Sequence, residues 1–238
     1  AGIPAGTAAL AILLGRSWDY INDPIIGHIS DRTRTRWGRR RPFLLFGALP
    51  LALAFSMLWW RPPWASVTAR AVYYGLAYLL FDTVATFNYM PYMALTPELT
   101  SDYDERTSVT TYRMVFSILG SLLAFTLPLL LVGSFSPENA PRVLWMGIIF
   151  GLISAVPLVL VFFGTRERSE YSEQHQPGLR ESLRAVRTNR PFLFSLLMFL
   201  FTWLPVDIVE ATLLFFVKHC AQRESESDLL MATIFVTA

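Results

Sequence analysis

Long apolar blocks separated by short polar segments dominate the hydropathy pattern of the chain. The complete blocks lie at about 4–30, 42–60, 71–96, 106–132, 142–163 and 191–217, and another begins near 229. An α-helix needs about 20 residues to cross roughly 30 Å of hydrocarbon, and each complete block is long enough. No ten-residue alternation of apolar and polar positions recurs, as a membrane β-barrel would require. The pattern predicts an all-α, polytopic membrane protein.

The composition agrees with this prediction and argues against several classes of function. Charged residues make up 16% of the chain, whereas soluble domains carry about 25%. The net charge of +2 gives no indication of nucleic-acid binding, and the single cysteine excludes a disulfide within the chain. No His or Cys spacing is typical of a metal site, and no nucleophile–base set is visible. We therefore expect neither an enzyme nor a cofactor, and no metal beyond a possible coupling Na⁺.

Basic residues are distributed unequally between the two sets of loops. Of 20 Lys and Arg residues, 13 lie in the loops 31–41, 97–106 and 164–190, and 5 lie in the opposite loops. Because Lys and Arg accumulate on the inner side of membranes, we expect the first set of loops to be cytoplasmic and the protein to lie in the plasma or cytoplasmic (inner) membrane. Leucines and arginines within 178–188 suggest a short surface helix, with a solvated linker as the alternative.

The first apolar block carries the strongest functional signal. Arg16, Asp19 and Asp23 fall at i, i+3 and i+7, which is one face of a helix. Charges at membrane depth cost at least ~2.5–3.5 kcal/mol each, so they need partners or a function. Two carboxylates one turn apart can bind a monovalent cation or share a proton, with Arg16 as their charge partner. The alternative is a buried ion-pair network that only holds helices together.

The loop after this block also has a distinctive pattern, GHISDRTRTRWGRRR from residue 27 to residue 41. The pattern resembles the signature cytoplasmic loop between the second and third helices of major facilitator transporters. That resemblance implies a latch that holds neighbouring helices together in the outward-facing state. The implied latch residues are Gly27, Asp31, Arg32, Arg36, Gly38 and Arg39. On the residues alone, the arginines are explained equally well as a topology signal, and both readings can hold.

Longer stretches of the chain are more specific than the superfamily pattern. They are WDYINDPIIG (18–27), TRTRWGRRRP (33–42), MPYMALTPEL (90–99), DERTSVTTYRM (104–114), NRPF (189–192) and FFVK (215–218). Together they resemble the glycoside–pentoside–hexuronide:cation symporter family, across essentially the whole chain. By the register of this resemblance, the chain carries helices two to seven and the start of helix eight of a twelve-helix major facilitator fold. We therefore expect a partial fold that lacks helix one and helices nine to twelve.

The resemblance also implies roles for individual residues. The implied cation-binding residues are Asp19, Asp23 and Thr86, and Arg113 is implied to line the substrate cavity. We expect the substrate to bind close to Arg113, Tyr89 and Trp18. One position departs from the pattern, because melibiose permease, a member of the family, has an aspartate on the fourth helix where this chain has Tyr89. This departure weakens the case for melibiose-type recognition, although a phenol can still bond to or stack on a sugar.

The expected function is Na⁺- or H⁺-coupled symport of a glycoside, pentoside or hexuronide by alternating access. We expect a monomer in the lipid bilayer with no nucleic-acid partner. The alternatives are symport of a lysophospholipid or other amphiphile, and a non-transporting relative that acts as a receptor or assembly partner. The expected domains are an N-terminal helix bundle (1–163), a central cytoplasmic loop (164–190) and the start of a C-terminal bundle (191–238).

Overall fold

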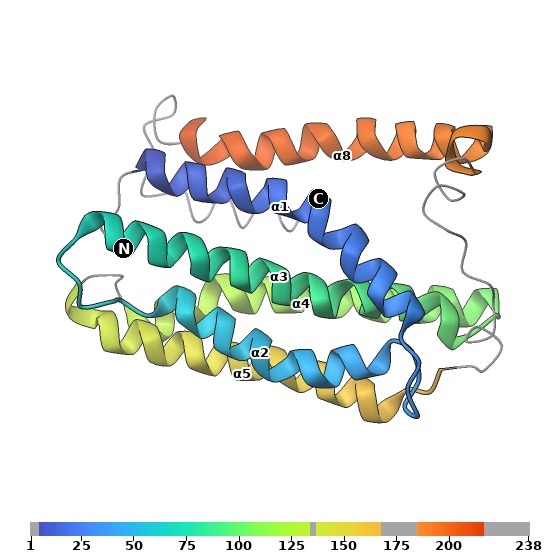
Figure 1. Cartoon of the computed structure of the whole chain (residues 1–238), viewed down its shortest axis with the longest axis horizontal. Helices are drawn as coiled ribbons and strands as arrows, with labels where there is room; N and C mark the ends of the chain where they lie inside the picture. Colours follow the sequence, from blue (N-terminus) through green and yellow to red (C-terminus); the bar gives the residue numbers. More distant parts are fainter. Residues whose placement is uncertain (1–4, 134–136, 168–184, 217–238) are drawn as a thin grey trace. The chain divides into compact units, whose positions relative to one another are not determined.

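The computed structural model of the chain describes residues 5–133, 137–167 and 185–216 (Figure 1). The chain forms two compact units, Ala1–Gln174 and His175–Ala238. The first unit contains α1 (Ala5–Arg32), α2 (Arg41–Trp59), α3 (Val67–Leu99), α4 (Tyr103–Val132), the 3₁₀ turn η1 (Pro137–Asn139) and α5 (Ala140–Gly164). The second unit contains α8 (Arg190–Phe216).

These six α-helices coincide with the six complete apolar blocks, and the described residues contain no strand beyond an isolated bridge between Thr35 and Gly38. The all-α prediction is therefore confirmed. The apolar block near 229 lies outside the described residues. Most of the expected surface helix at 178–188 does too, and only its residues 185–188 are described, as one helical turn.

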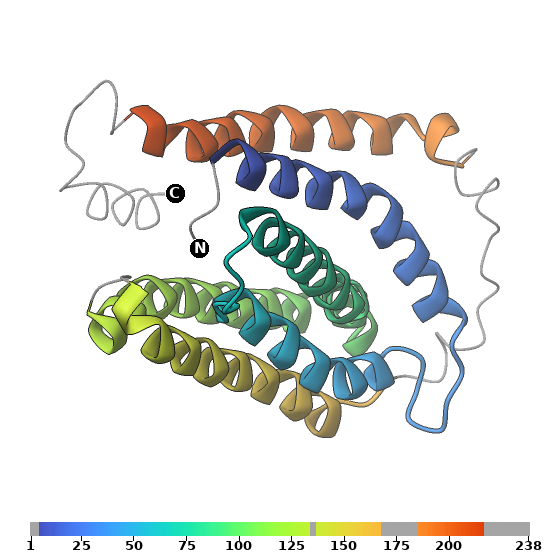
Figure 2. The same cartoon turned by 60° about the vertical axis from the view of Figure 1, so that its left-hand side comes forward.

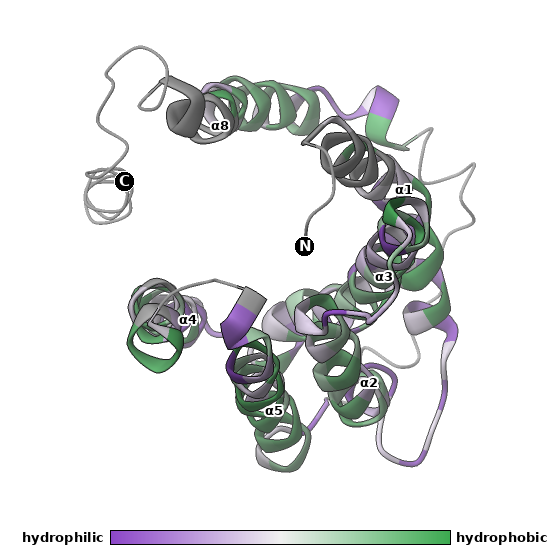
Figure 3. Ribbon diagram, turned by 90° about the vertical axis from the view of Figure 1, so that its left-hand side faces the viewer, coloured by the Kyte–Doolittle hydropathy of each residue, from purple (hydrophilic) through white to green (hydrophobic). Residues whose placement is uncertain are grey.

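Hydropathy divides the helices into two groups. Among the described residues, α2, α4 and α5 are both long and apolar enough to cross a membrane, and α8 has a shorter apolar stretch, Arg190–Pro205. Figure 3 shows hydrophobic residues along α2, α4 and α5, whereas polar residues are mixed into α1. With 28 and 33 residues, α1 and α3 are long enough to span, but they carry the charged and polar groups of the candidate site.

Small residues set the packing of the first unit, in which α2 packs against α3 and α5, and α1 packs against α3. A Cβ atom at Gly151 of α5 would lie 2.7 Å from the backbone oxygen of Ala52 on α2. A Cβ atom at Gly147 would meet the ring of Trp59 in the same interface. Membrane helices approach closely where such small residues face each other, so these glycines hold α2 and α5 together.

Prolines interrupt all six of the described α-helices. A proline inside a helix removes one backbone hydrogen bond and bends the axis. Figure 2 shows this bend along α1, which contains Pro24 one residue after Asp23. Because neighbouring helices can satisfy the freed backbone groups, membrane helices tolerate prolines. The bend in α1 thus falls beside the two candidate carboxylates.

We expect Gly151→Ala to destabilise the full-length protein, because the new methyl group would collide with the backbone of α2. Overpacking of this kind costs about 1–3 kcal/mol. The matched control is Gly75→Ala on α3, where a Cβ atom would meet none of the described residues within 4 Å. That control should be neutral or slightly stabilising, because alanine is the better helix former. Thermal unfolding of the purified protein in detergent measures both, and equal melting temperatures for the two variants would contradict this packing.

Candidate functional site

Two threonines on one face of α3 contact α1. The Thr86 hydroxyl donates a hydrogen bond to Asp23 Oδ1 at 3.2 Å, and the indole Nε1 of Trp18 donates to Thr83 Oγ1 at 2.9 Å. Thr86 is buried, whereas Asp23 is half-buried. Two of the three expected cation-site residues are therefore in contact, and oxygens from both helices face one region. Asp19 lies one turn before Asp23 and is also half-buried.

Asn22 belongs to the same region, and the sequence analysis did not single it out. Its side chain is 3% exposed, and its amide nitrogen has no hydrogen-bond partner among the described residues. Its position directly before an intramembrane aspartate could have identified it in the sequence as a member of the site. The side chain of Arg16, the expected charge partner, lies outside the described part of the chain. Within that part, no cluster of three or more His, Cys, Asp or Glu side chains could hold a metal ion.

The expected substrate-binding residues are more widely distributed. Arg113 on α4 is half-buried and donates a hydrogen bond to the sulfur of Met93 on α3 at 3.3 Å. Among the described residues, its guanidinium forms no ion pair with Asp19 or Asp23. Tyr89 is 54% exposed on α3. In the described part of the chain, these groups are thus not joined into one site by direct contacts.

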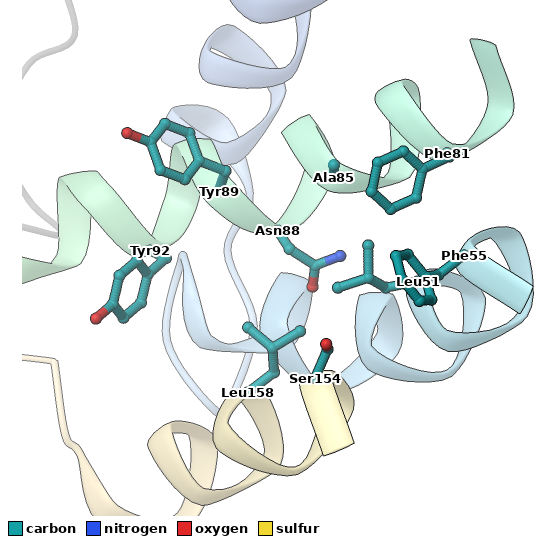
Figure 4. Close-up of a pocket in the computed structure, with 9 residues that line it drawn as sticks. All are labelled: Leu51, Phe55, Phe81, Ala85, Asn88, Tyr89, Tyr92, Ser154 and Leu158. Atoms are coloured by element: carbon teal, nitrogen blue, oxygen red, sulfur yellow. The ribbon is translucent and has the colours of Figure 1, made fainter. Parts of the chain in front are cut away.

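A pocket of about 330 Å³ lies between α2, α3 and α5 (Figure 4). Its lining is mostly apolar, and it includes Tyr89 but neither Trp18 nor Arg113. Asn88 is buried there, donates hydrogen bonds from Nδ2 to the backbone oxygens of Gly47 at 3.2 Å and Val84 at 2.8 Å, and so ties α3 to α2. Figure 4 shows the Asn88 side chain directed away from α3 toward α2, and the Tyr89 ring pointing in another direction from α3.

The arginine loop, which we define as residues 33–40, is held by a buried carboxylate on α3. Glu98 Oε1 accepts hydrogen bonds from Arg39 Nη2 at 2.7 Å and from Arg40 Nε at 2.9 Å. Arg40 Nη2 also pairs with Asp31 Oδ1 on α1 at 2.9 Å. Arg39, Arg40 and Glu98 are only 6%, 8% and 7% exposed. The network joins the ends of α1 and α3 to the beginning of α2.

Only some of the expected latch residues take part in this network. Asp31 and Arg39 belong to it, through an ion pair and through Glu98, respectively. Arg32 and Arg36 are exposed, and Arg36 lies over the ring of Trp37, 4.5 Å from its centroid. Gly27 is half-buried, and a Cβ atom there would meet nothing within 4 Å. The latch role of these residues remains a prediction.

A second carboxylate contacts the first turn of α2. Glu167, just after α5, accepts hydrogen bonds from the backbone N–H groups of Arg39 at 2.6 Å, Arg40 at 2.8 Å and Arg41 at 2.9 Å. The first N–H groups of a helix have no partner within it and carry a partial positive charge, so a carboxylate there is stabilising. Arg41 reinforces the junction through Nε, which donates to the backbone oxygen of Phe162 at 3.0 Å.

Sequence reasoning assigned no role to Glu98 or Glu167. Glu98 had a usable signal, because a carboxylate in the last turn of a helix opposes the helix dipole and needs a cation nearby. Glu167 gave no signal, because it lies between two arginines in a polar segment and contacts residues 126 to 128 positions earlier. Only the folded chain brings it to the beginning of α2.

Comparison with known proteins gives a consistent result. The family described as MFS/sugar transport protein matches residues 1–238. The inner membrane symporter YicJ of Escherichia coli K12 is 32% identical over 217 residues, which cover 91% of this chain and 47% of that protein. The sodium-dependent lysophosphatidylcholine symporter 1-A of Danio rerio is 28% identical over an alignment of 265 residues, which covers 97% of this chain and 49% of that protein. The isoprimeverose transporter of Lactiplantibacillus pentosus is 29% identical over 222 residues (92% and 46%).

The chain belongs to the MFS/sugar transport protein family of the major facilitator superfamily. It spans between about a third and a half of the length of the curated relatives it matches. This match and the apolar helices confirm three expectations. They are the family resemblance, the partial major facilitator fold and the assignment as an integral membrane protein. The relatives are named as symporters and transporters, which agrees with a transport protein rather than an enzyme.

We expect Glu98→Gln to destabilise the full-length protein strongly, because it leaves two buried guanidinium groups without a shared counter-charge. Breaking a buried ion pair from one side costs about 3–5 kcal/mol. The matched control is Asp104→Asn at the exposed beginning of α4, where removal of one negative charge should change stability by less than about 0.5 kcal/mol. Thermal unfolding checks both variants, and a Glu98→Gln protein as stable as the control would exclude a structural role for the network.

Proposed function

We propose that the protein is a secondary transporter that couples the movement of a cation, Na⁺ or H⁺, to the uptake of a sugar-type solute. The observation that carries the proposal is the contact between Thr86 and Asp23, which adds a hydroxyl oxygen to the two carboxylates of α1. Oxygen ligands suit hard cations, and a hydroxyl that now donates to a carboxylate can turn an oxygen lone pair toward an ion. The cation site in this proposal comprises Asp19, Asp23 and Thr86, with Asn22 as a neighbour.

The mechanism follows from the cost of charge at membrane depth. An empty site keeps two negative carboxylates half-buried beside a bend in α1, and closing the protein around them is unfavourable. A bound cation or proton neutralises part of this charge, so the loaded carrier can change between outward-facing and inward-facing states. Substrate would bind near Trp18, whose indole is anchored to Thr83 within two turns of the cation site. The carrier would act as a monomer, and no other cofactor is required.

Two substrate classes agree with the relatives. One relative is named as an isoprimeverose transporter and another as a lysophosphatidylcholine symporter, and their identities to this chain are similar. We favour a glycoside, pentoside or hexuronide, because Trp18 and Arg113 offer stacking and hydrogen-bond donors to a polyol. The second candidate is an amphiphile, which is supported by Tyr89 and the mostly apolar pocket that it lines.

The test is uptake by the full-length protein in proteoliposomes, with sodium and proton gradients imposed separately. Labelled glycosides, pentosides and hexuronides form one arm, and a lysophospholipid forms the other. Accumulation driven by one gradient identifies the coupling ion, and competition identifies the substrate class. Uptake that a lysophospholipid blocks and no glycoside blocks would favour the amphiphile. Absence of flux with folded protein under both gradients would reject symport of either class and favour the non-transporting relative.

We expect Asp23→Asn to abolish cation-driven accumulation, because an amide can neither balance the charge of a cation nor take up a proton at the pH of the assay. Exchange of substrate without a gradient should persist at a reduced rate. The matched control is Asp104→Asn, which removes a carboxylate from an exposed position outside the site. Uptake assays at equal protein density compare the two, and undiminished gradient-driven accumulation in Asp23→Asn would remove this residue from the cation site.

We expect Thr86→Val to raise the cation concentration that gives half-maximal uptake by roughly tenfold, because one oxygen ligand is worth about 1–1.5 kcal/mol. Thr126→Val is the matched control, since the Thr126 hydroxyl donates a hydrogen bond within α4, to the backbone oxygen of Leu122 at 2.8 Å. Cation titrations of initial uptake rates measure both constants. A shift of equal size in the two variants would show that Thr86 is not a ligand.

A further inference from the structure

Glu167 makes an unusually complete set of contacts for a residue outside a helix. Its two carboxylate oxygens accept three backbone N–H bonds of 2.6–2.9 Å from residues 39–41, at the junction between the arginine loop and α2. Backbone N–H groups in a row around one anion fix the conformation of the segment that carries them. Glu167 therefore holds the backbone of the segment, whereas Glu98 holds two of its side chains.

Gly38 is shaped to this carboxylate in two ways. Its φ of +109° is a conformation that favours glycine over residues with a side chain. In addition, a Cβ atom at Gly38 would lie 2.6 Å from both Cδ and Oε1 of Glu167 and 2.8 Å from Oε2. The space that a side chain would need is thus occupied by the carboxylate. The backbone angle favours glycine at this position, and a Cβ atom would in addition force the Glu167 carboxylate to shift.

We propose that Glu167 is a positioning residue of the transport cycle, and that Gly38 is its steric partner. The pair seats the arginine loop on the first turn of α2 and ties it to the end of α5. With Glu98 on α3 and Asp31 on α1, four helices then hold the loop from separate directions. The loop moves with the first unit as one body, so the charges it presents keep a defined orientation when the carrier changes state.

The structural half of this proposal is tested by a double-mutant cycle in the full-length protein, with thermal unfolding as the readout. Gly38→Ala should lower the melting temperature more in the wild-type background than in the Glu167→Ala background, by at least roughly 3 °C. The reason is that removing the carboxylate removes the collision and leaves only the backbone strain. Additive effects of the two substitutions would show that Gly38 and Glu167 are not in steric contact, and would overturn this half of the proposal.

The chain contains a matched control for backbone strain alone. Gly133 also has a positive φ, +75°, but a Cβ atom there would meet none of the described residues within 4 Å. Gly133→Ala and Glu167→Ala should therefore be additive. If Gly38→Ala alone cannot be recovered folded, recovery of the folded double variant with Glu167→Ala supports the proposal. Failure of the double variant, with Gly133→Ala folded, counts against it.

The functional half rests on the proposed transport activity and has its own readout. We expect Glu167→Gln to change the ratio of net uptake to equilibrium exchange at least threefold, because exchange does not require the empty carrier to reorient. Glu167→Asp, which keeps the charge, should restore most of the ratio. A variant that only lowers the amount of folded carrier reduces both rates equally, so an unchanged ratio would overturn this half. Absence of any transport by the wild-type protein would instead refute the proposed function. The double-mutant cycle would still test whether Glu167 and Gly38 hold the arginine loop on α2.

Discussion

The arrangement of the first unit depends on two adjacent arginines that are removed from water and share one carboxylate. Arg39 and Arg40 can be buried only because Glu98 stands at the end of α3, and Glu98 is acceptable in that last turn only because the guanidinium groups offset the helix dipole. Neither partner is stable there without the other. This mutual dependence fixes the ends of α1, α2 and α3 relative to one another, and it aligns Asp23 on α1 with Thr86 on α3 farther along the same two helices.

Hydropathy was sufficient to predict all six described α-helices, because length and apolar content decide whether a segment can lie in a membrane. The boundaries were less accurate where polar residues extend a helix. The structure begins α4 at Tyr103 rather than 106, because Asp102 Oδ1 accepts bonds from the N–H groups of Asp104 and Glu105 at 2.9 Å each. It begins α3 at Val67, where the Ser66 hydroxyl caps the helix. Local capping, unlike hydropathy, leaves only a weak pattern.

The candidate site was predictable to the extent that its members share one helix. The helical spacing of Asp19 and Asp23 identified the charged face directly, and the family resemblance added Thr86 from another helix. Glu167 could not be found in either way, because its contacts close a loop of more than 120 residues and depend on where α5 ends. Residues that line one element are visible in periodicity, whereas residues that join elements appear only when the packing is known.

The hydrogen bond between Trp18 and Thr83 has a spectroscopic consequence. Indole emission responds to the polarity and hydrogen bonding of its surroundings, and this indole is fixed between α1 and α3, five residues before Asp23. By contrast, Trp60 and Trp64 contact each other and Tyr73 in an aromatic cluster between α2 and α3. The protein therefore carries an intrinsic fluorophore beside its candidate ion site, and a variant that keeps only this one of the seven tryptophans would report changes around that site without an attached label.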